Sequence, residues 1–406
     1  GAVTNVVEIF KGRDTTPPRV KTLEIHIPAM TLTMEYNKKI PLCAIVAIVY
    51  EIARMILKHI LEQINEMEVE KYCGKRYQRG NLLRNGKRRR KIVTLLGEVI
   101  LSLTRIRGKG IPLYNLVEFE SGNYQSDIKA ISVDSAVKMT YRDSRDEINR
   151  FTKSPSHQTI WRYTQEAGSK INNEFSYEVY FSTDKTKLHS RRKKIELTLI
   201  EGKNIAVRVN RSYEDLKKEL NLDGLVLGDV DTDLKCFKER QVDFIHVFRE
   251  VNYKLWEHGV DLDTRKEYVN DVKKILLSLK NSLCKPDLEE RIKRAEQSIK
   301  EFADEMQNKG FWKVAKFFRN YTRNILLFAY KKLEGISIPW HNNRMERKMG
   351  EISKRMKNKW MSWSVKGAQN LASLVMKRSC ERSYYERFLE RIMKRKNIKW
   401  EVNLHQ

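Results

Sequence analysis

Cysteine is scarce in this sequence, and no two cysteines have the spacing of a paired motif. The five thiols lie far apart, with no CxxC pair among them: Cys43, Cys73, Cys236, Cys284 and Cys380. This spacing argues against a zinc ribbon, which needs closely spaced pairs of thiolates, and against a secreted disulfide framework. We therefore expect a reducing intracellular compartment.

A long uninterrupted apolar run is also missing. The most apolar stretch, residues 40–57, is broken by Glu51 and Arg54, which a membrane span would not usually carry together. Apolar residues recur at three- and four-residue spacing over residues 44–70, which predicts one long amphipathic helix. We interpret it as a helix of a soluble protein that packs or dimerises, and we expect no membrane partner.

Acidic residues are few relative to basic ones. The 406 residues include 79 Lys and Arg against 52 Asp and Glu, for a net charge of +27. The electrostatic field of so positive a chain attracts nucleic acid. A hydrophobic content of 41% is nevertheless enough for real cores, so the chain is not a disordered basic tail. This length predicts two or three domains.

Basic residues concentrate before residues 92–105, which have the pattern of strands. We interpret this region as a basic loop followed by a hairpin. A charge run can be simply a solvated face, but the high Arg content favours phosphate contact. The candidate nucleic-acid-binding residues are Lys75, Arg76, Arg79, Arg84, Lys87, Arg88, Arg89, Arg90 and Lys91.

A second candidate DNA contact lies between residues 132 and 168. A helical stretch is followed by Ser154-Pro155-Ser156 and then by a second helix that begins at His157. In a helix-turn-helix, the polar side chains of the second helix face the major groove while apolar ones pack the pair. The polar candidates are His157, Gln158 and Arg162, and the packing candidates are Ile160 and Trp161. An ordinary helical hairpin fits the same spacing.

Strand patterns begin at residue 178. They cover residues 178–183, 194–201, 205–209 and 225–228, with a helix over residues 212–220, and predict a mixed α/β sheet. Residues 252–333 have a helical pattern, with Trp256, Trp312, Phe317, Phe318, Tyr321 and Phe328 as packing residues. Two basic helices are expected over residues 343–376 and 380–393.

Three carboxylates are the candidates for chemistry. Asp184 and Asp229 each follow an apolar strand pattern, so neighbouring strands would present both at one edge of the sheet. Glu346 is expected in the first turn of a helix capped by Asn342 or Asn343. Carboxylates are the hard ligands of two-metal phosphoryl transfer. Each acid on its own could instead be a simple cap, and Asp231, Asp233 and Glu351 compete for the same role.

A further group follows the second aspartate. His246 either contacts the active site or is a satisfied core residue. Arg249 binds a phosphate or pairs with Asp243.

Taken in order, these motifs resemble the catalytic region of DDE transposases, in particular the Mutator-like superfamily and related prokaryotic insertion-sequence transposases. Asp184 matches the first aspartate and Asp229 the second. Asp243 and His246 match a Cys-or-Asp, two residues, His signature. Residues 343–346 match the family's Asn-x-x-Glu, which follows a helical insertion. Val230 departs from the small residue common after the second aspartate, and this leaves the choice between Asp229 and Asp231 open.

The resemblance implies a ribonuclease H-like catalytic domain with a mixed sheet and a large all-helical insertion, preceded by a mainly helical, basic DNA-binding region. The expected segments are an N-terminal helical and basic hairpin region (1–125), a helix-turn-helix-like region (126–172), the first part of the catalytic domain (173–251), a helical insertion (252–335) and the glutamate helix with C-terminal helices (336–406).

The resemblance also implies an enzyme that cleaves mobile-element ends and joins their 3′-hydroxyls to target DNA. Two Mg2+ ions, or Mn2+ as substitute, would be held by Asp184, Asp229 and Glu346, with His246 orienting a carboxylate or phosphate. Arg249 and Arg344 are further candidates for DNA contact. The expected partners are double-stranded DNA and at least one more copy, in the cytoplasm of a prokaryotic cell, associated with the nucleoid. The alternatives are a structure-specific endonuclease such as a junction resolvase, and an inactive or domesticated DNA-binding protein.

Overall fold

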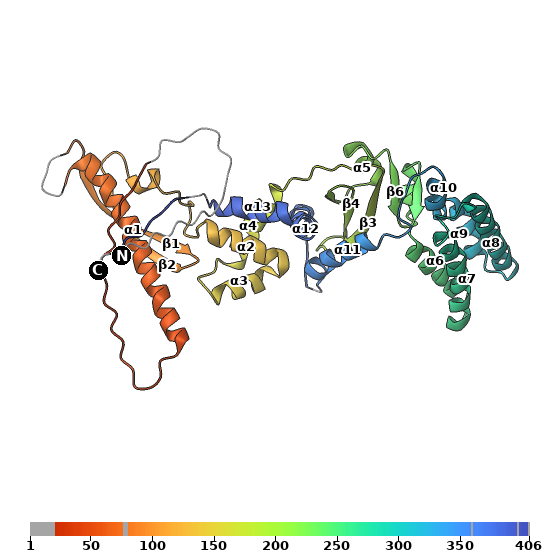
Figure 1. Ribbon diagram of the computed structural model, residues 1–406, viewed down its shortest axis with the longest axis horizontal. Helices are drawn as coiled ribbons and strands as arrows, with labels where there is room; N and C mark the ends of the chain where they lie inside the picture. Colours follow the sequence, from red (N-terminus) through yellow and green to blue (C-terminus); the bar gives the residue numbers. More distant parts are fainter. Residues whose placement is uncertain (1–20, 76–79, 359, 396–397, 405–406) are drawn as a thin grey trace. The chain divides into compact units, whose positions relative to one another are not determined.

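The computed structural model describes residues 21–75, 80–358, 360–395 and 398–404 (Figure 1). The chain divides into two units, which are considered separately below. The first unit comprises the described parts of Gly1–Glu166 and Ser383–Gln406, and the second comprises those of Ala167–Arg382. Residues 383–406, which the sequence grouped with the glutamate helix, thus belong to the first unit.

A long helix and a hairpin form the core of the first unit. Helix α1 (Leu42–Cys73) confirms the predicted amphipathic helix and extends slightly beyond it at both ends. The antiparallel hairpin of β1 (Arg84–Thr94) and β2 (Gly97–Ile106) packs on its C-terminal half through Leu61, Ile64 and apolar residues of both strands. Buried Asn65 of α1 donates to Thr104 O and accepts from Leu113 N, in the short helix η1 (Pro112–Asn115), both at 3.1 Å.

The expectation of a basic loop before the hairpin is wrong for residues 87–91. The predicted hairpin is present, but residues 87–91 lie within β1 rather than in a loop before it. Each of these basic residues is paired with a residue of β2, for example Arg89 with Ser102. Pairing with an apolar neighbouring strand therefore extends β1 into a sequence that its charge alone marks as a loop.

Helices complete the first unit. They are α2 (Ser126–Lys138), α3 (Tyr141–Asn149), α4 (His157–Ser169), which runs across the boundary between the units, and α13 (Arg382–Met393). The expected stretch before Ser154 is broken at Thr140, whose side chain accepts from Asp143 N and caps α3. The predicted start and cap of α4 are confirmed, since Ser156 Oγ accepts from Thr159 N at 3.2 Å. Ile160 is fully buried, but Trp161 faces outward rather than packing.

A mixed sheet organises the second unit, as expected, but it has five strands, and the last of them is not among the four predicted strand patterns. Its strands are β3 (Tyr180–Leu188), β4 (Ile195–Glu201), β5 (Ile205–Val209), β6 (Leu225–Gly228) and β7 (Arg240–Val242). They lie in the order β5-β4-β3-β6-β7. The pairs β3–β4 and β4–β5 are antiparallel, whereas β3–β6 and β6–β7 are parallel.

The two faces of this sheet are covered differently. One face packs on α5 (Tyr213–Glu219) and on residues around the short helix η2 (Thr232–Cys236) through a cluster that includes Phe181 and Val226. Helices α11 (Asn343–Met356) and α12 (Val365–Cys380) pack on the other side of the sheet, α11 against β3 and β4 and α12 against β4 and β5 (Figure 1). The sequence predicted one helix over residues 343–376. The structure divides it because Trp363 Nε1 donates to Met356 O and Ser364 caps α12.

Five helices follow the last strand and share a core, which agrees with the helical pattern predicted over residues 252–333, although the first of them begins earlier, at Phe244. They are α6 (Phe244–Glu257), α7 (Leu262–Lys280), α8 (Leu288–Asn308), α9 (Trp312–Ile325) and α10 (Leu327–Leu333). Phe317, Phe318 and Phe328 are buried in this core. Trp256 and Trp312, expected among the packing residues, are 58% and 50% exposed, because both project from the outer face of their helices.

Phe244 gives a test of this core. Its ring is fully buried and lies 5.3 Å from that of Phe328 and 5.0 Å from that of Trp340. Phe244→Ala should lower the free energy of unfolding by about 3–5 kcal/mol, through lost transfer energy and a cavity. Tyr253→Ala on the exposed side of the same helix should change it by less than about 0.5 kcal/mol. Denaturant unfolding measures both, and equal losses would contradict this packing.

No helix in the part of the chain that the structure describes is long and apolar enough to span a membrane.

Candidate active site

Asp184 and Asp229 lie side by side on one face of the sheet. In the parallel pair β3–β6, Ser182 is opposite Leu227, and each aspartate comes two residues later. Because side chains of a strand alternate between faces, a two-residue step brings both carboxylates to the face of Ser182 and Leu227. The expectation that both close a strand is wrong for Asp184, since β3 continues to Leu188 by pairing with β4, with Asp184 opposite Leu199. Asp229 does directly follow β6.

Glu346 reaches this group from α11. It lies in the first turn, as predicted, and Asn342 is the N-cap residue, although its side chain does not cap the helix. Instead, Asn342 N donates to Asp243 Oδ2 at 3.0 Å, and Asn342 Nδ2 lies 3.5 Å from the carbonyl oxygen of Thr183. The start of α11 is thereby tied to the residue before Asp184.

The negative charges of Asp229 and Glu346 act on Asp184. Burial raises the pKa of Asp184 above its ordinary value, and the negative charges of Asp229 and Glu346 add to the rise. The hydrogen bond from Lys185 N and the nearby His246 oppose it. The site is therefore a place where negative charge is concentrated and where a cation would be favoured.

Helix α6 provides a partner for two of the three acids. His246 Nδ1 lies 3.1 Å from Asp229 Oδ1, so His246 contacts the site rather than being only a core residue. One turn later, Arg249 Nη1 lies 3.5 Å from Glu346 Oε1. Arg249 thus pairs with Glu346 and not with Asp243, the pairing that the sequence suggested as an alternative to phosphate.

The competing acids have other contacts. The side chain of Asp231 accepts from Asp233 N at 3.0 Å and caps η2. Asp233 lies 3.9 Å from Lys185 Nζ, and Glu351 pairs with Lys354 at 3.0 Å. Among the second-aspartate candidates, Asp229 is therefore the one that contacts His246 and acts on Asp184.

Asp243 is a residue whose importance the sequence did not indicate beyond its place in a motif. It is fully buried, and its backbone N donates to Gly228 O at 3.1 Å. One carboxylate oxygen accepts from Ile245 N and caps α6, and the other accepts from Asn342 N. Burial raises its pKa. Asp243 therefore fixes the end of β6, the start of α6 and the start of α11, which carry Asp229, His246 and Glu346.

Asp243→Ala should therefore loosen the starts of α6 and α11, which carry His246 and Glu346, because it removes both side-chain acceptors, while the backbone bond to Gly228 O remains. We expect about a 10- to 100-fold loss of any reaction rate that depends on the three acids. This is the usual effect of removing a residue that orients a functional side chain through a hydrogen bond. Asp243→Asn, which keeps an acceptor for Ile245 N, should recover part of that loss. Single-turnover rates measured for folded variants test this; an unaltered rate in Asp243→Ala would refute the positioning role.

The basic candidates of β1 fall into two groups. Arg84 pairs with Glu66, Lys91 pairs with Glu98 at 3.0 Å, and Arg90 donates to the carbonyl oxygens of Glu120 and Gly122. Of the basic residues in β1, Lys87, Arg88 and Arg89 are exposed and have no hydrogen-bond or ion-pair partner among the described residues. These three form the free cationic strand. Lys75 is exposed, and Arg76 and Arg79 lie outside the described residues.

The candidates of α4 are in the first unit with β1. Gln158 and Arg162 are exposed, His157 is half-buried, and Arg162 Nη2 lies 3.3 Å from Thr159 Oγ1. Their helix begins where the sequence predicted, but nothing in its contacts distinguishes a DNA-reading helix from an ordinary one.

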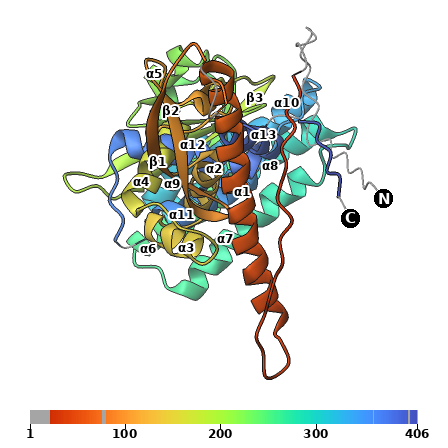
Figure 2. The same ribbon diagram turned by 90° about the vertical axis from the view of Figure 1, so that its left-hand side faces the viewer.

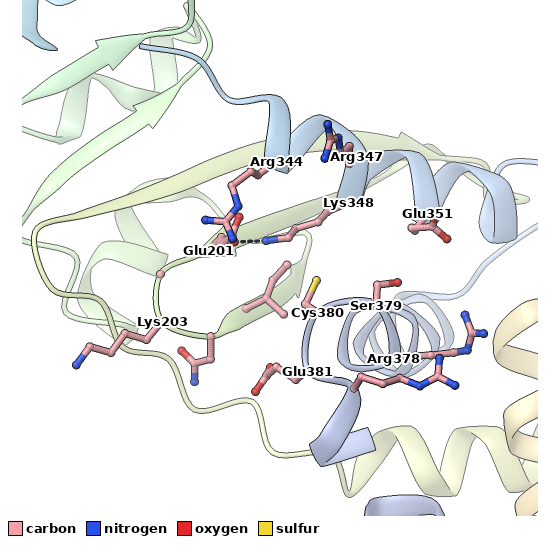
Figure 3. A pocket seen from close by; sticks show the side chains of 14 residues that line it. Glu201, Lys203, Arg344, Arg347, Lys348, Glu351, Arg378, Ser379, Cys380 and Glu381 are labelled. Atoms are coloured by element: carbon pink, nitrogen blue, oxygen red, sulfur yellow. Dashed lines mark ion pairs between the residues drawn. The ribbon is translucent and has the colours of Figure 1, made fainter. Parts of the chain in front are cut away.

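Arg344 points into a pocket of about 770 Å³ rather than toward Glu346 (Figure 3). Two positions along an α-helix correspond to about 200° of rotation, so the two side chains leave α11 on nearly opposite sides. Lys348 pairs with Glu201 at the edge of this pocket. Cations outnumber acids in its lining, which includes Lys203, Arg344, Arg347, Lys348, Arg378 and Arg382 against Glu201, Glu351 and Glu381.

The donor chemistry of the three carboxylates fits Mg2+ or Mn2+, which prefer anionic oxygen ligands. In the described residues, however, no three or more His, Cys, Asp or Glu side chains are gathered closely enough to hold a metal ion. Two of the three carboxylates instead contact side chains of α6, Asp229 with His246 and Glu346 with Arg249.

Comparisons with known proteins add one relative. The sequence is 44% identical to an uncharacterized protein of Archaeoglobus fulgidus over 100 residues, which are 24% of this chain and the whole of that protein. The chain belongs to the same family as this archaeal protein. A comparison with protein-family profiles finds no match.

Proposed function

We propose that this protein is a DDE-type transposase, which cleaves DNA at the ends of a mobile element and joins the freed 3′-hydroxyls to target DNA. The observation that carries the proposal is that Asp229, after β6, and Glu346, on α11, lie near enough to Asp184 of β3 for their negative charges to raise its pKa. The sequence separates these residues widely, so their meeting is not a consequence of local spacing.

The topology supports a ribonuclease H-like assignment for the second unit. Three antiparallel strands in chain order are followed by two parallel strands added at the β3 edge, with α5 connecting the two sets. The first acid lies on the central strand and the second at the end of the neighbouring parallel strand. The third lies on a helix that follows five inserted helices and runs along the sheet. Fold alone does not establish function, so the acids carry the argument.

Each residue has a role that follows from its contacts. Asp184, Asp229 and Glu346 would hold two Mg2+ ions, which when bound activate the attacking water or hydroxyl and stabilise the leaving oxygen. His246 orients Asp229 through its Nδ1 contact. Arg249 compensates the charge of Glu346 and, being largely exposed, is placed to bind a DNA phosphate in exchange. Asp243 and Asn342 keep the supporting elements together.

The role of His246 can be separated from that of the acids. His246→Ala should lower the single-turnover cleavage rate by about 10- to 100-fold while leaving DNA affinity unchanged, because it removes the group that orients Asp229. Restoring a hydrogen-bonding group with His246→Asn should recover part of the rate. A change in affinity equal to the change in rate would contradict an orienting role.

The function itself is tested with labelled duplexes made from DNA that flanks the coding sequence, incubated with protein, Mg2+ or Mn2+ and a supercoiled target plasmid. Labelled strands joined to the plasmid would support transposition. Cleavage without joining would indicate an endonuclease such as a junction resolvase. DNA binding without any metal-dependent cutting would indicate an inactive binding protein.

A further inference from the structure

An unusual amount of apolar surface is exposed at the start of the described chain. Residues 21–40 form an extended segment without helix or strand that runs beside α1 and turns back into its first residues (Figure 2). Large apolar side chains on the segment and on the N-terminal half of α1 are between 38% and 73% exposed: Leu23, Ile27, Met30, Leu32, Met34, Tyr36, Leu42, Val46, Val49, Tyr50 and Met55. We call this set the N-terminal apolar surface.

The spacing of these apolar residues is typical of strands and helices that bury one face. Met30, Leu32, Met34 and Tyr36 alternate with polar residues, as in a strand with one buried face. Leu42, Val46, Val49 and Tyr50 follow the spacing of one helix face. Yet all the buried residues of α1 lie at or beyond Leu61. The sequence of this region is therefore suited to burial, and the single chain leaves it in water.

The backbone N–H and C=O groups of the extended segment are also largely unpaired. Among the described residues, no backbone–backbone hydrogen bond joins residues 21–40 to another part of the chain. The segment is held by contacts such as that of His59 Nε2 with His26 O and the packing of Ile25 on the core of the first unit. An extended segment with free N–H and C=O groups is a template for pairing with another strand.

We propose that two copies of this chain associate through the N-terminal apolar surface. Charge favours a second copy as the occupant. Each copy carries a net charge of +27, but residues 27–34 and 40–50 contain no Asp, Glu, Lys or Arg. Two copies can meet across these stretches without placing like charges opposite each other, which few other surfaces of so basic a chain permit.

The size of the surface agrees with this occupant. Eleven large side chains, each about half exposed, present on the order of 1,000 Å² per copy, compared with about 800 Å² per partner in a stable interface of standard size. A patch this large is rare on a soluble monomer. A two-fold symmetric pair would bury this patch on both copies.

Sedimentation equilibrium of the full chain, free of nucleic acid and in high salt, tests the proposal. We expect a dimer at micromolar concentration. Val46→Glu/Val49→Glu should raise the dimer dissociation constant at least 100-fold, because it places like charges opposite each other in a desolvated contact. Met30→Glu/Leu32→Glu should do the same, and it alters a segment without secondary structure, so loss of fold cannot explain its effect.

A matched control is Tyr253→Glu/Trp256→Glu, which adds the same charge to exposed aromatic residues of α6. It should leave the dimer intact. A wild-type chain that remains monomeric would overturn the proposal. A dimer that survives both N-terminal variants would also overturn it. Because neither DNA nor metal is present, the result is independent of the proposed catalytic function.

Discussion

Replacing Asp184 by Asn is expected to reduce metal-dependent DNA cleavage and joining by at least about 1,000-fold, with little change in DNA affinity. Asn has the same shape as Asp but lacks the charge that a divalent ion requires, and Asp184 is the most central of the three acids. Single-turnover assays on a labelled DNA end measure the rate, and a binding assay without metal measures the affinity.

The same experiment decides between the two candidates for the second ligand. Asp229→Asn should lose activity to a similar extent, because Asp229 contacts His246 and acts on Asp184. Asp231→Asn is the matched control, two residues away on the same loop, and should retain activity to within about tenfold because Asp231 only caps η2. If Asp231→Asn were inactive and Asp229→Asn active, the assignment of the site would be wrong.

Removing the charge of the free cationic strand should have the second largest effect. Lys87→Gln/Arg88→Gln/Arg89→Gln leaves every ion pair of the hairpin intact, because these side chains have no partner in the described residues. Three lost phosphate contacts should weaken DNA binding about 100-fold at low salt and lower the slope of log affinity against log salt by roughly 2.7, at about 0.9 per contact.

A control for net charge is available in the second unit. Lys266→Gln/Lys274→Gln/Lys300→Gln removes the same charge from exposed positions of α7 and α8. Its salt dependence should stay close to that of the native chain. Equal effects of the two triple variants would mean that β1 contributes only to a general field and makes no direct phosphate contact.

Much of the fold could be predicted because local pattern determines it. The boundaries of β5 and β6 agree with the sequence, as do the existence of α1 and the helices after β7. These elements have strong apolar periodicity of their own. Errors occurred where a distant segment decides the outcome: β3 extends past Asp184 because β4 pairs with it, and residues 87–91 are in a strand because β2 is adjacent.

The sequence could predict the acidic residues of the site, but not the hydrogen bonds and ion pairs that position them. The order of motifs pointed to Asp184, Asp229 and Glu346, and to His246 beside them. The bond from Asn342 N to Asp243 spans 99 positions, and no local pattern indicates it. The contact of Arg249 with Glu346 likewise depends on how α6 and α11 meet. The exposure of Trp256 could not be read from its type, since large aromatic residues are usually packed.

The central claim is that the three acids form one divalent-metal centre, and iron-directed cleavage of the polypeptide tests it most directly. Fe2+ bound in place of Mg2+, with ascorbate and peroxide, generates radicals that cut the nearest backbone. The account predicts cuts close to residues 184, 229 and 346, suppressed by excess Mg2+ and absent in Asp184→Asn. Cutting elsewhere, or at only one of the three segments, would contradict a shared site.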